Sequence, residues 1–173
     1  MRRMFRKNNF AHVFKAVKKS FVLLALSGLF LVSSCYQKFE TLVVRSTDEG
    51  IIFSHPAMDD ALRRGDFCIF GEISVSRRDA ADNLQEEMWF VQNTESGFQT
   101  SAEPLKKSYI VYGETLPQTR ILIEPKPLRE GLYRVSGVIG IYNQKRELLR
   151  DLSFNDEFGL KANASGKLIV AEK

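Results

Sequence analysis

Short runs of β-branched and aromatic residues, separated by turn-forming residues, fill most of the chain. Such runs are typical of strands, and alternation of apolar and polar positions marks strands with one buried face. The alternation is clearest in the segment 132–142, where Tyr133, Val135 and Ile139 share one face. The predicted strands are Phe39–Arg45, Ile51–Phe53, Phe67–Ser76, Met88–Gln92, Ser108–Tyr112, Arg120–Glu124, Leu132–Tyr142, Glu147–Phe154 and Lys167–Ala171. This number of short strands predicts a mainly β domain, an antiparallel β-sandwich of the immunoglobulin-like or a similar type, or a barrel.

Turn residues between these runs predict two hairpins. Asn143-Gln144-Lys145 interrupts the segment 132–154, and Asn163-Ala164-Ser165-Gly166 precedes the last strand. Short connections of this kind join antiparallel neighbours. Gly137 and Gly140 lie inside a strand pattern, which indicates a bulge or the close approach of another backbone.

One or two short helices are expected among the strands. Pro56 suits a first helical position, Asp59 lies near the start, and Gly65 follows the predicted end. These residue types match the preferences of helix termini and of the helix dipole. A second segment, Ala80–Glu87 behind Asp79 as N-cap, is predicted either as a helix or as a polar loop between strands.

The first 34 residues have a different pattern. Seven basic residues and no acidic residue precede Cys35, and the apolar run Phe21–Val32 contains 12 residues. A membrane-spanning helix needs about 20 residues, so this run fits the hydrophobic part of a secretory signal better. The small residues Ser33 and Ser34 suit a cleavage site.

The segment Leu31-Val32-Ser33-Ser34-Cys35 resembles the lipobox of bacterial lipoproteins. The resemblance implies cleavage after Ser34 and a lipid on the sulfur of Cys35. The chain then divides into a signal peptide (1–34), a lipidated N-terminus with a short tether (35–39) and a β-sandwich domain (40–173). Two alternatives stay open, an uncleaved anchor and ordinary signal cleavage that leaves Cys35 as a thiol. Met4 is an alternative start to Met1.

Removal of the signal reverses the charge. The whole chain has 25 basic and 21 acidic residues, net +4. Subtracting the seven basic residues before Cys35 leaves 18 against 21, net −3. Nucleic-acid binding needs a basic surface on the working domain, so nucleic acid is not expected as a partner. The remaining 139 residues are enough for one domain with its own core.

Residues with reactive side chains are few after Cys35. His55 is the one histidine there, no Gly-x-Ser-x-Gly motif occurs, and a single histidine with one thiol cannot supply a zinc site. No catalytic residue, metal or cofactor is therefore predicted. Cys68 lies in an apolar run and is expected to be buried. If Cys35 carries no lipid, a Cys35–Cys68 disulfide becomes an alternative.

Two further features bear on binding. Trp89 and Phe90 are neighbours on a predicted strand, so they point to opposite faces and one is a candidate contact for a partner. Asn155-Asp156-Glu157 is predicted as a turn, because the spacing of a calcium loop is missing.

These observations lead to one expectation and one alternative. The expected function is a non-enzymatic, lipid-anchored interaction or assembly module, with the membrane and an envelope membrane protein as partners. In lipoproteins of bacteria with two membranes, a residue other than Asp after the lipidated cysteine resembles an outer-membrane sorting signal, and this chain has Tyr36. The outer membrane, on its periplasmic face, is the expected location. The alternative is a periplasmic carrier of a small ligand or lipid, which requires an apolar cavity.

Overall fold

The computed structural model describes residues 39–79, 81, 83–94 and 102–171. The elements in this part of the chain are β1 (Val43–Thr47), β2 (Gly50–Ser54), α2 (Pro56–Arg63), β3 (Phe67–Arg78), β4 (Leu84–Asn93), β5 (Tyr109–Val111), β6 (Thr119–Ile123), β7 (Gly131–Tyr142), β8 (Leu148–Ala162) and β9 (Leu168–Ala171). The expectation of a mainly β fold with a short helix is confirmed.

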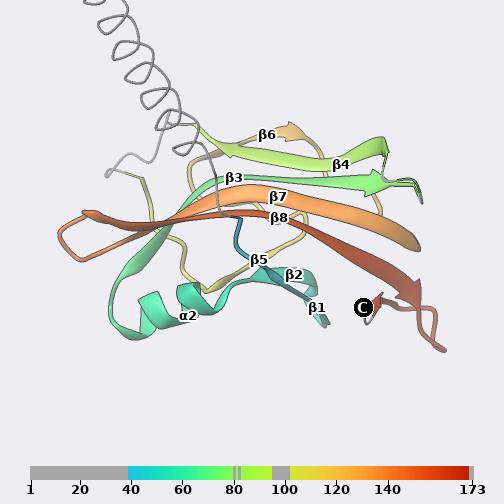
Figure 1. Ribbon diagram of the computed structural model, residues 1–173, viewed down its shortest axis with the longest axis horizontal. Coiled ribbons are helices and arrows are strands. Elements are labelled where there is room, and N and C mark those ends of the chain that lie inside the picture. Colours follow the sequence, from blue (N-terminus) through green and yellow to red (C-terminus); the bar gives the residue numbers. More distant parts are fainter. Residues whose placement is uncertain (1–38, 80, 82, 95–101, 172–173) are drawn as a thin grey trace, which may run out of the picture. The chain divides into compact units, whose positions relative to one another are not determined.

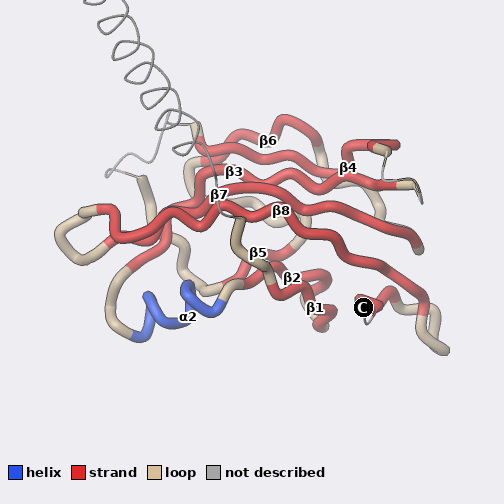
Figure 2. Tube along the Cα trace, viewed as in Figure 1, coloured by secondary structure: helices blue, strands red, loops and turns tan. Residues whose placement is uncertain are grey.

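The strands form two antiparallel sheets (Figure 1, Figure 2). The larger sheet has the order β6-β4-β3-β7-β8-β9, and the smaller has the order β1-β2-β5. Both predicted hairpins are confirmed, since β7 pairs with β8 and β8 pairs with β9 across short turns. The larger sheet curls, so that its last strand, β9, approaches β1 of the smaller sheet.

The centre of the larger sheet explains one of the two glycines singled out in the sequence. The register between β3 and β7 shifts between Phe70 and Glu72, which is a bulge in β3. A Cβ atom at Gly137 of β7 would lie 2.2 Å from the carbonyl oxygen of Glu72 and 2.8 Å from the ring of Phe154. The predicted close backbone approach at Gly137 is therefore confirmed.

The helix α2 also follows its sequence signals. Pro56 occupies the first turn, Asp59 lies in that turn and Arg63 lies in the last. Gly65 follows with φ +79°, a conformation that suits glycine after a helix end. Met58 and Ala61 are fully buried, which fixes the helix against the core.

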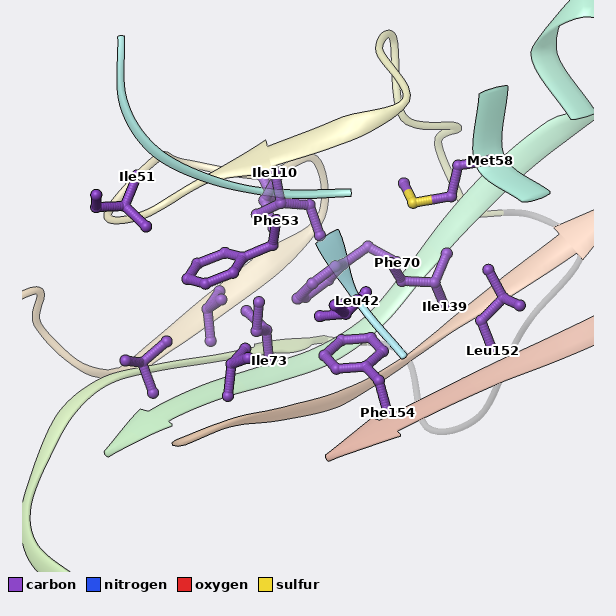
Figure 3. Close-up of a cluster of buried hydrophobic side chains, with 14 of the residues drawn as sticks. Leu42, Ile51, Phe53, Met58, Phe70, Ile73, Ile110, Ile139, Leu152 and Phe154 are labelled. Carbon is purple, nitrogen blue, oxygen red and sulfur yellow. The ribbon is translucent and has the colours of Figure 1, made fainter. Parts of the chain in front are cut away.

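The hydrophobic core lies between the two sheets and beneath α2 (Figure 3). Phe53 of the smaller sheet meets Phe158 of the larger sheet edge to face, with ring centroids 5.7 Å apart. The ring of Tyr133 stacks on Phe158 at 5.5 Å. Cys68 is a free, fully buried cysteine, as predicted. Its burial raises the pKa of the thiol to about 11, so the thiol is unreactive at neutral pH.

Two sequence predictions are wrong. The second helix does not form, because β4 begins at Leu84 and Glu86 pairs with Arg77 on β3. The carboxylate of Asp79 accepts hydrogen bonds from the N–H groups of Ala81 and Asn83, and so caps a turn rather than a helix. The second error is the turn predicted at 155–157.

The residues 155–157 lie in the middle of β8, a strand of 15 residues. Phe154 and Phe158 are buried on the inner face, and Asp156 lies on the same face between them. The polar triplet therefore continues the alternation instead of ending it. From this inward position, the carboxylate of Asp156 reaches the backbone N–H of Leu42.

Candidate functional site: a groove between two sheet edges

A groove with a volume of about 680 Å³ lies between β1 and the strands β8 and β9. This volume falls in the range of ligand pockets in proteins. Its walls are mainly apolar, with a few polar groups. The lining includes Leu42, Val44, Phe158, Val170, Arg45 and Asp156.

Three polar contacts, which we call the edge joint, connect the β1 segment to the larger sheet. The carboxylate of Asp156 accepts a hydrogen bond from the backbone N–H of Leu42, with an N···O distance of 2.6 Å. The hydroxyl of Ser46 accepts one from the N–H of Val170 at 2.7 Å. The third contact is an ion pair of 2.6 Å between Glu40 and Arg150.

On the edge of β1 that faces the groove, the backbone groups of Val44 have no hydrogen-bond partner among the described residues. In an antiparallel sheet, the backbone N–H and C=O groups of successive residues point alternately to the two sides of the strand. The N–H of Tyr112 donates to the carbonyl of Ile51, so Ile51 faces β5 and Ile52 faces β1. Ile52 pairs with Arg45, which directs the backbone groups of Val44 away from β2 and toward the groove.

The facing edge of β9 is arranged in the same way. The N–H of Asn163 donates to the carbonyl of Lys167, which closes the β8–β9 hairpin. The hydrogen-bonding direction of successive residues alternates from this pair onward. The backbone groups of Ile169 therefore point toward β8, and those of Val170 point toward the groove. The N–H of Val170 is the group that donates to Ser46. Two strand edges thus border the groove, joined to each other by a side chain rather than by a β-ladder.

His55 lies next to the edge joint and caps α2. Its Nδ1 accepts a hydrogen bond from the N–H of Ala57 at 3.1 Å, and its Nε2 is 3.9 Å from the carboxylate of Glu40. Burial lowers the pKa of His55 from the ordinary 6.5, and Arg150 lowers it further, while the carboxylates of Glu40 and Asp156 act in the opposite direction. A nitrogen that accepts a hydrogen bond carries no proton, so the cap requires the neutral ring.

The two aromatic candidates from the sequence lie away from the groove. Trp89 is fully buried and meets Tyr112 edge to face, with centroids 5.4 Å apart. Its Nε1 has no hydrogen-bond partner among the described residues. Phe90 is half-buried and pairs with Ser74 and Ile123 on the opposite face of the sheet. The structure therefore places one of the pair in the core and the other on a sheet face.

Other sequence predictions lie outside the described residues. These are the signal peptide 1–34, with its cleavage site at Ser34, and the lipidation site Cys35. Within residues 39–79, 81, 83–94 and 102–171, no group of three or more histidine, cysteine or acidic side chains could hold a metal ion. In that same part of the chain, no helix has the length and hydropathy to cross a membrane.

The groove itself was not predicted from the sequence. Asp156 was assigned to a turn, and neither Ser46 nor the edge of β1 was singled out. A signal was present, because Leu152, Phe154 and Phe158 alternate with polar residues across the position of Asp156. A polar residue on the apolar face of a long strand indicates a buried partner.

No protein-family model, curated protein or solved structure matches the chain.

Proposed function

We propose that the protein is a lipid-anchored, non-enzymatic lipoprotein of a bacterial cell envelope, attached through Cys35 to the periplasmic face of the outer membrane. In this proposal it acts as an interaction or assembly module, and the groove between β1 and β9 receives an extended segment of an envelope membrane protein. The lipobox-like segment ending at Cys35 supports the anchor. The backbone groups of Val44 at the edge of β1 support the binding mode.

The edge of β1 at Val44 is the observation that carries this proposal. Its backbone N–H and C=O groups point into the groove, opposite the edge of β9. An extended peptide supplies the complementary row of acceptors and donors, and adds a strand to the sheet. The apolar side chains of Leu42, Phe158 and Val170 would give such a segment places for alternate apolar residues.

The contacts of the two ring nitrogens of His55 favour a structural role over a catalytic one. A histidine that acts as general base needs a free ring nitrogen within reach of the reacting group. In this protein Nδ1 is used to cap α2, and Nε2 faces Glu40. We therefore assign His55 to the capping of α2 beside the edge joint, and not to a reaction.

A photo-crosslinking side chain at Val44 tests the proposal in living cells. We expect one reproducible adduct with an envelope protein. The matched control is the same side chain at Leu122, a 42% exposed residue on β6 at the other edge of the larger sheet, which should give no such adduct. Equal adduct patterns from Val44 and Leu122 would refute a binding groove at β1.

A carrier of a small apolar ligand or lipid is the second candidate, and the apolar lining of the same groove favours it. The same experiment separates the two functions. A protein adduct at Val44 supports the interaction module, whereas an adduct of lipid mass supports the carrier. The anchor is tested separately by the N-terminal mass of the membrane-extracted protein, with a Cys35→Ala variant as control.

A further inference from the structure

We propose that the protein lies against the lipid surface that anchors it through three exposed residues, Phe39, Leu148 and Leu149, which we call the membrane-contact patch. This inference rests on the proposed lipid at Cys35, and it adds which end of the domain faces the bilayer. Phe39 and Leu149 are each 53% exposed and Leu148 is 47% exposed. Large apolar side chains with this exposure, clustered at one place, mark a contact surface.

The residues of the patch are close in space although more than 100 positions separate them in the sequence. Phe39 precedes Glu40, and Leu149 precedes Arg150. The side chains of Glu40 and Arg150 form an ion pair of 2.6 Å. The N–H of Glu40 also donates to the carbonyl of Ser153 at 2.7 Å, which holds the first described residues along β8. Glu40 lies opposite Phe154 in a parallel β-bridge, so Phe39 lies beside Ser153, four residues or roughly 13 Å along β8 from Leu149.

The short tether between Cys35 and Phe39 keeps the proposed lipid anchor near the membrane-contact patch. Four peptide steps separate Cys35 from Phe39. A fully extended chain spans at most about 3.6 Å per residue, so the lipidated residue lies within roughly 14 Å of Phe39. A lipid anchored at Cys35 thus puts the bilayer surface beside the patch. Apolar side chains at such a surface bury themselves among the acyl chains near the headgroups.

The turn between β7 and β8 adds basic groups beside the patch. Lys145 is exposed on this turn. Arg146 donates to the carbonyl of Ala102 and lies 5.3 Å over the ring of Phe67, which fixes its guanidinium. Basic side chains next to apolar ones favour the surface of a bilayer with anionic headgroups. The acidic Glu147 in this turn accepts a hydrogen bond from Asn143.

An exposed leucine outside the patch provides the comparison. Leu84 is 56% exposed, but it begins β4, where it pairs with Arg78 at the end of β3. Leu148 pairs with Tyr142, which is opposite the start of β3. Since β3 has 12 residues, the two positions are separated by roughly 36 Å along the sheet. Figure 1 shows the β7–β8 turn and the beginning of β4 at opposite ends of the larger sheet.

Fluorescence quenching in liposomes tests this orientation. The mature protein, extracted from membranes with its N-terminus intact, is labelled at Leu149→Cys or at Leu84→Cys with an environment-sensitive dye. Cys68 is fully buried and stays unlabelled in the folded protein. Each variant is reconstituted into vesicles of phosphatidylethanolamine and phosphatidylglycerol that contain a nitroxide-labelled lipid. We expect at least threefold stronger quenching at position 149 than at position 84.

The mass of the same sample separates this inference from the proposed function. Equal quenching at the two positions, in protein whose Cys35 carries lipid, would overturn the membrane-contact patch and leave the anchor intact. An unmodified Cys35 would overturn the anchor, and the orientation with it. A label at Phe39→Cys is a second reporter of the patch, and quenching there that matches position 84 would equally contradict the proposal.

Discussion

The larger sheet and the edge joint are held together by different interactions. In the larger sheet, β7 pairs with β8 along almost their whole lengths, and the inner face is packed with fully buried side chains. At the edge joint, β1 meets the larger sheet through side-chain contacts of Asp156, Ser46 and the Glu40–Arg150 ion pair. Continuous ladders and apolar packing give stability, whereas a few polar contacts leave an edge that another chain can join.

The largest effect is expected in the larger sheet, from Gly137→Ala. The new Cβ would lie 2.2 Å from the backbone oxygen of Glu72, and that backbone belongs to the central strand. Overpacking against backbone costs about 3 kcal/mol, and urea unfolding measures it. Gly159→Ala is the matched control on β8, because its Cβ would meet the Cβ of Ala171 at 3.3 Å and can be accommodated. Equal losses in both variants would contradict a specific close approach at Gly137.

Elements whose signals are local were predictable from the sequence. The helix α2 follows from Pro56, Asp59 and Gly65, and the β7–β8 hairpin follows from alternation interrupted at the turn 143–145. The strand at Leu84–Glu87 was missed, because its polar residues fit a helix as well as a strand. The segment adopts the strand conformation because Glu86 pairs with Arg77 on β3. That pairing depends on tertiary structure, which the local sequence does not show.

The second prediction breaks the edge joint with Asp156→Ala. The N–H of Leu42 would lose a charge-assisted hydrogen bond in a half-buried position, at a cost of about 2 kcal/mol. Amide exchange of β1 should become faster, while exchange in β7 stays unchanged. Asp156→Asn keeps an acceptor oxygen and should lose less stability. If Asn and Ala are equally destabilising, the hydrogen bond to Leu42 does not hold the joint.

The groove could not be predicted because its parts are distant in the sequence. Leu42 and Asp156 are separated by 114 positions, and Ser46 and Val170 by 124. They meet because the larger sheet curls, which depends on the twist of all its strands together. Alternation along β8 does predict that Asp156 points inward, but it does not identify a backbone N–H as the partner.

The third prediction concerns Ser46→Ala at the other end of the groove. The N–H of Val170 would lose its acceptor, with an expected loss of about 1 kcal/mol in urea unfolding. The matched control is Ser54→Ala, since the hydroxyl of Ser54 donates at 3.3 Å to the carbonyl of Val43, a group already directed toward β2. A loss at Ser54 as large as that at Ser46 would remove the special role of Ser46 in the joint.

The smallest effect is a pH dependence that His55 gives to the edge joint. Because burial lowers its pKa in the folded protein, the unfolded chain binds more protons below the ordinary value of 6.5. The stability contributed by neutral His55 is therefore complete above pH 6.5 and is lost as the pH falls below it.

His55→Asn keeps an N-cap acceptor but does not titrate, so its stability at pH 7 should differ from that of the wild type by only a few tenths of a kcal/mol. Unfolding measured from pH 7.5 down to about pH 5 should fall more steeply in the wild type than in His55→Asn. Parallel curves would mean that the cap at Ala57 does not depend on the charge of His55, and that the edge joint is insensitive to pH in this range.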